Sequence, residues 1–264
     1  MKLSVFFQHA KIASAQRGED IAAVLRRFRA AGIETVEIDP CDATDETIAL
    51  LRNAELRVGS MPIWFDFADA AFDPADTAFL RLPLAMGATH LLVLPALRRP
   101  DDGPDAFART IKGVAAVSAH CRDAGIVPLI EDFDDLRSPT CRPDDIARLL
   151  DAVPDLAFNF DTGNFAILGE SPLDLYPRFA DRIAYLHAKD RTTKAEYGAA
   201  VTAPDGTAYR SCPVGAGDIP FAELFRRLAD DGIDVPVAIE CYGASDMLSA
   251  VLSSARFLRG VSRT

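Results

Sequence analysis

The sequence has few of the features that crosslink a protein or attach it to a charged surface. Its five cysteines are odd in number and form no C-x-x-C pair, which argues against a disulfide framework or a zinc ribbon and favours reduced thiols in the cytoplasm. Lys and Arg total 28 against 39 Asp and Glu, so a net charge of −11 argues against binding to nucleic acid or an anionic membrane. Its longest apolar runs are shorter than a transmembrane helix.

The chain also lacks the G-x-G-x-x-G turn that a doubly wound dinucleotide-binding sheet carries after an early strand. It contains eight short apolar segments that alternate with eight segments of helical periodicity. Continuous apolar runs of this length are typical of strands buried on both faces of a parallel sheet. Because 264 residues give about 33 per strand–helix unit, the sequence predicts an α/β fold, a (β/α)8 TIM barrel, as a single domain over residues 1–264.

The predicted strands share runs of Val, Ile, Leu or Phe. They cover residues 2–8, 35–40, 57–65, 89–95, 127–133, 156–164, 183–190 and 235–243. Helical spacing is clearest at 20–31, 105–123 and 219–229. About 28 residues separate the seventh strand from its helix, and a long connection in a compact domain usually has a function.

Four consecutive predicted strands each end in a side chain that can bind a metal. These residues are Glu131, Asp161, His187 and Glu240. Active sites of such barrels lie at the carboxyl ends of the strands, so the four side chains are expected at one level of one pocket. Three carboxylates and one imidazole suit a divalent cation. Taken singly, Asp161 has an alternative as a helix N-cap and His187 as a hydrogen-bonded core residue.

The sequence resembles the xylose isomerase-like superfamily of sugar phosphate isomerases and epimerases, which also includes endonuclease IV type enzymes. The matching motifs are IEDF around Glu131, FDTGN at 160–164, LHAKD at 186–190, PVGAGDIPF at 213–221 and AIECYG at 238–243. The resemblance implies one divalent metal ion (Mn²⁺, Mg²⁺, Co²⁺ or Zn²⁺) bound by Glu131, Asp161, His187 and Glu240. It also implies that Glu131 and Glu240 act as the catalytic acid/base pair.

The activity implied is that of an isomerase or epimerase acting on a small sugar or sugar phosphate. The metal would bind the carbonyl and a neighbouring hydroxyl of a ketose, one glutamate would remove the adjacent C–H proton, and the other would protonate the enediolate. The alternative is a dehydratase of a cyclic polyol or sugar acid such as an inosose, in which a β-hydroxyl leaves instead. A barrel that only binds metal is less favoured, because all four ligands are present.

An endonuclease is also disfavoured, because a trinuclear zinc site needs several more histidines at strand ends. The chain has four histidines in all, and two of them lie elsewhere: His90 begins a strand and His120 lies within a helix. The partner expected is therefore a small carbohydrate, with no nucleic acid and no membrane. Helices exposed around a barrel are also compatible with a homo-oligomer.

Five further residues are candidates for substrate binding. Relatives among ketose 3-epimerases carry a histidine at the position of Asn164, which can still hydrogen-bond a sugar hydroxyl. Lys189 and Arg191 can meet a phosphate or carboxylate, or can form a solvated rim. Glu37 ends the second strand, and Trp64 follows a strand close enough to wall the pocket.

The glycines that precede the last predicted helix but one form a second candidate for anion binding. Gly215 and Gly217 come just before Asp218, where a helix is expected to start. Barrels often bind phosphate after the seventh strand, so these glycines are a candidate backbone nest for an anion. The alternative is a plain turn with Asp218 as the helix N-cap.

Overall fold

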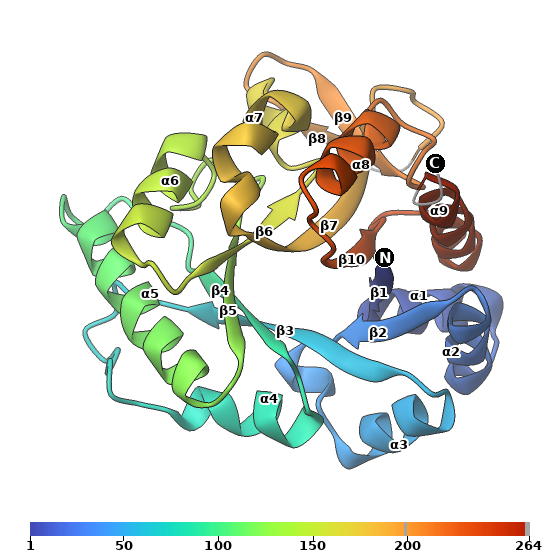
Figure 1. The fold of residues 1–264 in the computed structure, drawn as a ribbon, viewed down its shortest axis with the longest axis horizontal. Coiled ribbons are helices and arrows are strands. Elements are labelled where there is room, and N and C mark those ends of the chain that lie inside the picture. The colour runs from blue at the N-terminus through green and yellow to red at the C-terminus, as the bar shows by residue number, and fades with distance from the viewer. Residues whose placement is uncertain (198–199, 262–264) are drawn as a thin grey trace.

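The computed structural model describes residues 1–197 and 200–261. Within them, eight parallel strands pair in chain order and the last pairs with both the first and the seventh, which closes a barrel (Figure 1). The strands are β1 (Lys2–Phe6), β2 (Ile33–Glu37), β3 (Arg57–Phe65), β4 (His90–Pro95), β5 (Val127–Glu131), β6 (Ala157–Asp161), β7 (Ile183–Thr192) and β10 (Pro236–Glu240). The predicted (β/α)8 TIM barrel is confirmed.

Nine α-helices of the described residues surround the barrel, one more than predicted (Figure 1). They are α1 (Phe7–Arg17), α2 (Ile21–Ala30), α3 (Asp45–Asn53), α4 (Arg81–Met86), α5 (Ala106–Asp123), α6 (Pro143–Ala152), α7 (Pro172–Phe179), α8 (Phe221–Asp230) and α9 (Met247–Val261). The extra helix is α1, because the first strand ends at Phe6 and not at residue 8. Phe7, Ala10 and Ala13 are buried at helical spacing.

The hydrophobic core has two parts. The larger part lies between the strands and the surrounding helices, as expected for strands buried on both faces. The smaller part packs inside the barrel and consists of Leu92, Leu94, Leu129, Tyr185 and Ala238. No helix of the described residues combines the length and the hydropathy needed to cross a bilayer.

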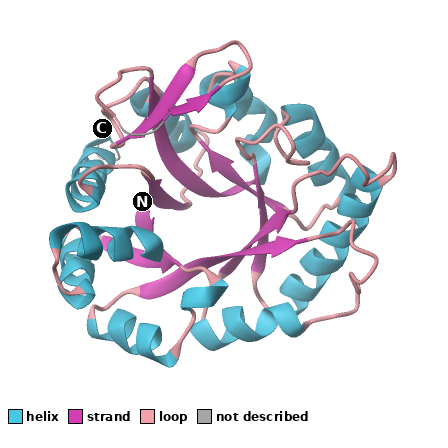
Figure 2. Cartoon of the chain, turned by 180° about the vertical axis from the view of Figure 1, so that it is seen from behind, coloured by secondary structure: helices cyan, strands magenta, loops and turns pink. Residues whose placement is uncertain are grey.

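Strand β7 is the one strand of the barrel that continues well beyond its neighbours. It runs for ten residues, and its last three residues pair with β9 (Ala208–Cys212) in antiparallel orientation. Strand β9 in turn pairs with β8 (Ala200–Thr202), which makes a small hairpin above the carboxyl end of the barrel (Figure 2). The long connection predicted after the seventh strand is therefore partly ordered as β structure and lies beside the strand ends.

Candidate functional site

The four predicted ligand residues all lie at the carboxyl end of the barrel. Glu131, Asp161 and Glu240 are the last residues of β5, β6 and β10. His187 lies in the middle of β7, level with Asp161 on β6, because β7 continues into the hairpin. Strand alternation places His187 and Lys189 on the same side of β7, and both line one cavity.

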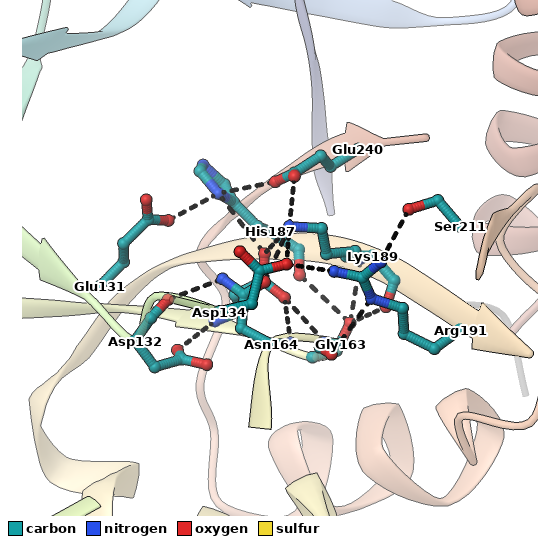
Figure 3. A network of polar contacts seen from close by, with 12 residues as sticks. Glu131, Asp132, Asp134, Gly163, Asn164, His187, Lys189, Arg191, Ser211 and Glu240 are labelled. Carbon is teal, nitrogen blue, oxygen red and sulfur yellow. Dashed lines mark hydrogen bonds and ion pairs between the residues drawn. The ribbon is translucent and has the colours of Figure 1, made fainter. Parts of the chain in front are cut away.

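The carboxylates converge on one nitrogen of His187 (Figure 3). His187 Nδ1 lies 3.0 Å from Glu131 Oε2, 3.3 Å from Glu240 Oε2 and 3.9 Å from Asp161 Oδ2. Glu131, Asp161 and His187 each offer a ligand atom within 4.8 Å of the other two, and all three are buried. The structure thus contains a three-residue cluster that can hold a metal ion, with Glu240 beside it.

Burial and mutual charge perturb every member of this cluster. Burial raises the pKa of Glu131 above its ordinary value. Burial alone would lower the pKa of His187, but the carboxylates of Glu37 and Glu131 hold it well above its usual range. Burial likewise opposes ionisation of Glu240, yet the neighbouring ammonium of Lys189 keeps its pKa below the ordinary value. The cluster therefore favours positive charge at the point where the carboxylates meet.

Two buried atoms of the cluster suit a cation. His187 Nδ1 is close to the carboxylates only as an ion pair, Asp161 Oδ2 lies 3.7 Å from Lys189 Nζ, and neither atom makes a hydrogen bond. Buried polar atoms are rarely left unpaired in folded proteins, and both atoms face the same point. Oxygen donors with one imidazole nitrogen are the ligands that Mg²⁺, Mn²⁺, Co²⁺ and Zn²⁺ share.

The second nitrogen of His187 is held by Glu37, at the end of β2. Glu37 Oε1 lies 3.0 Å from His187 Nε2, and both side chains are almost fully buried. An acceptor on Nε2 keeps a proton on that nitrogen, so a cation that replaced the Nδ1 proton would find the Nδ1 lone pair directed at it. Glu37 is not among the residues that line the cavity. The position of Glu37 therefore favours a role in orienting His187 and not the predicted role in binding substrate.

Another buried carboxylate, that of Asp132, holds the backbone at the end of β6. Asp132 Oδ1 accepts a hydrogen bond from the backbone N–H of Asp161 at 2.9 Å. The Asp161 side chain uses Oδ1 to accept from the N–H groups of Gly163 and Asn164. Asp161 therefore fixes the following turn with one oxygen and presents the other to the cluster. It is not a helix N-cap, because the short helix that follows has Asn164 at that position. The sequence analysis gave Asp132 no role.

Lys189 and Asn164 are bound to each other. Lys189 Nζ donates to Asn164 Oδ1 at 2.7 Å and lies 2.6 Å from Glu240 Oε1. The Asn164 amide donates to the backbone oxygen of Asp132 at 2.7 Å. Both polar ends of Asn164 are therefore engaged within the protein, whereas Lys189 lines the cavity beside Glu240.

Gly215 and Gly217 do bind an anion, but the anion is the side chain of Asp190. Their N–H groups donate to Asp190 Oδ2 at 2.8 and 2.9 Å, and the N–H of Ile219 donates to Oδ1. A Cβ at Gly217 would lie 2.2 Å from Asp190 Oδ1, so only glycine allows this close approach. The nest predicted for an external anion is occupied internally. Asp218 does not cap α8, whose N-cap is Pro220.

The cavity above the cluster has a volume of about 470 Å³. Its walls include Phe6, Leu94, Phe133 and Tyr242, together with Ser211 from the hairpin. Trp64 does not line it. Trp64 is largely exposed and packs edge-on against Phe133, which does line the cavity.

His9 is a buried residue near the site whose role the sequence did not reveal. Its ring lies between Phe6 and Tyr242, and its Nε2 accepts a hydrogen bond from the backbone N–H of Cys241 at 3.0 Å. Cys241 directly follows Glu240, so His9 fixes the backbone at the end of β10. Only the neutral ring can accept this bond.

We predict an acid-sensitive contribution of His9 to stability. Burial lowers the pKa of His9 from 6.5 to about 4. Between these two pH values the His9 side chain is therefore mostly protonated in the unfolded chain and mostly neutral in the folded protein. Stability should therefore fall as the pH drops from about 6.5 to 4, by about 3 kcal/mol in total. His9→Gln keeps an acceptor without this titration. Urea unfolding of the metal-free proteins should give a shallower pH dependence for H9Q, and parallel curves would contradict the prediction.

A family model described as a xylose isomerase-like TIM barrel matches residues 25–261. The chain belongs to this family. Among single proteins, the chain is similar to the uncharacterized protein YihM of Escherichia coli K12, with 27% identity over 146 residues. That match covers 54% of this chain and 41% of YihM, so it spans less than half of the relative.

Solved structures with the family's fold differ in their chemistry. The probable 3-DHS dehydratase AsbF of Bacillus anthracis has a TM-score of 0.72 at 16% identity, covering 98% of this chain and 99% of that one. The D-allulose 3-epimerase of Methylomonas sp. has a TM-score of 0.72 at 18% identity, covering 99% and 98%. A xylose isomerase-like protein of Mycobacterium smegmatis in complex with magnesium has a TM-score of 0.66 at 20% identity, covering 92% and 88%. At these identities the likeness establishes the fold alone.

Proposed function

We propose that this protein is a divalent-metal-dependent isomerase or epimerase that moves a proton on a small sugar. One observation carries the proposal. Two glutamates, Glu131 and Glu240, approach the same nitrogen of His187 to 3.0 and 3.3 Å, and both line the cavity. Two carboxylates at one site can remove a proton from one position of a substrate and return it to another.

The proposed ligands are Glu131, Asp161, His187 and Glu240. A divalent cation bound there would polarise the substrate carbonyl and acidify the C–H bond beside it. The protein holds each glutamate in place: Asn159 Nδ2 donates to Glu131 Oε2 at 3.2 Å, and Lys189 Nζ lies 2.6 Å from Glu240 Oε1. One carboxylate takes the C–H proton to give an enediolate, and the other returns a proton. Return to the opposite face gives an epimer, and return to the adjacent carbon gives an aldose–ketose isomer.

The position of Lys189 supports a second candidate function, that of a dehydratase of a cyclic polyol or sugar acid. Its ammonium lines the cavity next to Glu240, where it can give a proton to a departing hydroxyl. The first step is the same removal of a C–H proton beside a carbonyl. The β-hydroxyl then leaves as water, the C–O bond breaks and a carbon–carbon double bond forms.

Five unpaired cysteines support a cytoplasmic location as part of the proposal. None of Cys41, Cys121, Cys141, Cys212 and Cys241 forms a disulfide in the structure. Reduced thiols are the rule in the cytosol. Sugar metabolism in that compartment would also supply the small ketoses that the cavity can hold.

The test is proton exchange in deuterated water, followed by NMR. The protein is stripped with a chelator, reloaded with Mn²⁺, Co²⁺ or Mg²⁺, and mixed with a panel of ketoses, their phosphate esters and inososes. Deuterium at a carbon beside the carbonyl, with an isomer or epimer formed, supports the proposal. A keto-deoxy product identifies the dehydratase. Absence of exchange with every substrate and metal would overturn both.

A further inference from the structure

Besides His187 of the metal cluster, the described lining residues of the cavity include one lysine and one arginine, Lys189 and Arg191. Arg191 is nearly buried, and each of its nitrogens already has a partner. Nη2 donates to Asp134 Oδ2, Nη1 donates to Ser211 Oγ at 3.2 Å, and Nε lies 3.4 Å from the backbone oxygen of Gly163 (Figure 3). Three of the five N–H groups of the guanidinium are therefore engaged, and one of them binds a carboxylate that an anionic substrate group would have to displace or share.

Lys189 is similarly engaged. Its ammonium contacts Glu240 Oε1 and Asn164 Oδ1 and lies 3.8 Å from Asp134 Oδ2. Asp134 thus faces both cations. An anionic group on the substrate would have to displace Asp134 or lie beside it, and two negative charges at such a distance repel each other.

The rest of the cavity offers an anion no better place. Four acidic residues line it, namely Asp39, Glu131, Asp134 and Glu240. A divalent cation would be shared among Glu131, Glu240 and the buried Asp161, which together carry more negative charge than the ion supplies. The glycine nest after β7 is filled by Asp190. A buried anion without a partner is costly, so the cavity disfavours one.

The remaining walls suit the C–H faces and hydroxyls of a neutral sugar. Leu92, Leu94, Phe133 and Tyr242 supply apolar surface, and Ser211 Oγ and the carboxylates supply hydrogen-bonding groups. Pockets for small molecules combine apolar walls with a few placed polar groups in this way.

We propose that the substrate is an uncharged polyhydroxy carbonyl compound, and that Asp134 excludes phosphorylated and carboxylated sugars by occupying Arg191. The proposal rests on the proposed function and names its substrate class. It assigns Asp134 as a residue that sets specificity. The same geometry makes Arg191 a latent anion site that becomes available when the charge of Asp134 is removed.

The experiment compares a free ketose with its phosphate ester on the Mn²⁺-loaded protein. Calorimetric titrations with D-fructose and D-fructose 6-phosphate give the ratio of their affinities. We expect the wild-type protein to favour the free sugar by about tenfold or more, and Asp134→Asn to shift the ratio toward the ester by about tenfold, which is the effect of about 1.4 kcal/mol. Tighter binding of the ester by the wild type, or an unchanged ratio in D134N, would overturn the proposal.

A matched control comes from the next residue. Asp135 is bonded to Arg137 and does not line the cavity, so Asp135→Asn removes the same charge from the same segment without touching Arg191. D135N should keep the wild-type ratio, and an equal shift in D135N would count against a specific role of Asp134. Thermal unfolding checks that D134N is folded. Because binding is measured directly, the result stands even if no proton exchange is found.

Discussion

Replacing Glu131 or Glu240 by glutamine is expected to lower the rate of substrate C–H exchange by about 10²–10⁴-fold, the usual contribution of a positioned acid or base. Glutamine keeps the size of the side chain and an oxygen that can still bind a cation, but it cannot take a proton. Exchange into deuterated water measures the loss. Mn²⁺ binding, followed by its EPR signal, separates lost proton transfer from a lost metal site.

The matched control is Glu46→Gln. Glu46 is an exposed glutamate in the first turn of α3 and does not line the cavity, so this variant should exchange protons at the wild-type rate. If E131Q and E240Q both retained full exchange with metal bound, the two glutamates would not be the acid/base pair.

Replacing Glu37 by leucine is expected to weaken Mn²⁺ binding by about 10–100-fold, although Glu37 itself is not a proposed ligand. Without the acceptor on Nε2, the proton of His187 can move to Nδ1, where it occupies the nitrogen that faces Glu131 and Glu240. Glu37→Gln keeps an acceptor and should lose less than E37L. Calorimetric titration with Mn²⁺ near pH 7.5 measures the affinities.

Glu34 provides the control on the same strand. It is partly exposed on β2 and is not part of the cluster, so Glu34→Leu should bind Mn²⁺ like the wild type. Thermal unfolding of the metal-free variants distinguishes a disturbed ligand from a disturbed fold. Wild-type affinity in a folded E37L would mean that Glu37 does not position His187.

The residues at the strand ends were predictable because parallel strands present their carboxyl ends at one edge. That rule alone brings Glu131, Asp161 and His187 into one cluster. The boundary between β1 and α1 was not predictable, since the apolar run continues unbroken through Phe6 and Phe7 and serves first a strand and then a helix.

The partners of the polar residues were beyond the sequence for a different reason. Arg191 meets Asp134, 57 positions away along the chain, and His187 meets Glu37, 150 positions away. Both pairings join β7 to side chains on or just after strands that are not its neighbours in the barrel, and local sequence carries no record of which side chains meet there. The same holds for His9, whose acceptor nitrogen meets a backbone N–H 232 positions later.

The length of β7 constrains how the sequence of this barrel can change. Tyr185, His187, Lys189 and Arg191 alternate along a single continuous strand, so they face the barrel interior together. One residue inserted or deleted in β7 before Tyr185 would turn all four of these side chains toward the surrounding helices. Point substitutions at Lys189 or Arg191 can therefore retune the pocket, whereas a change of spacing in β7 would abolish it in one event.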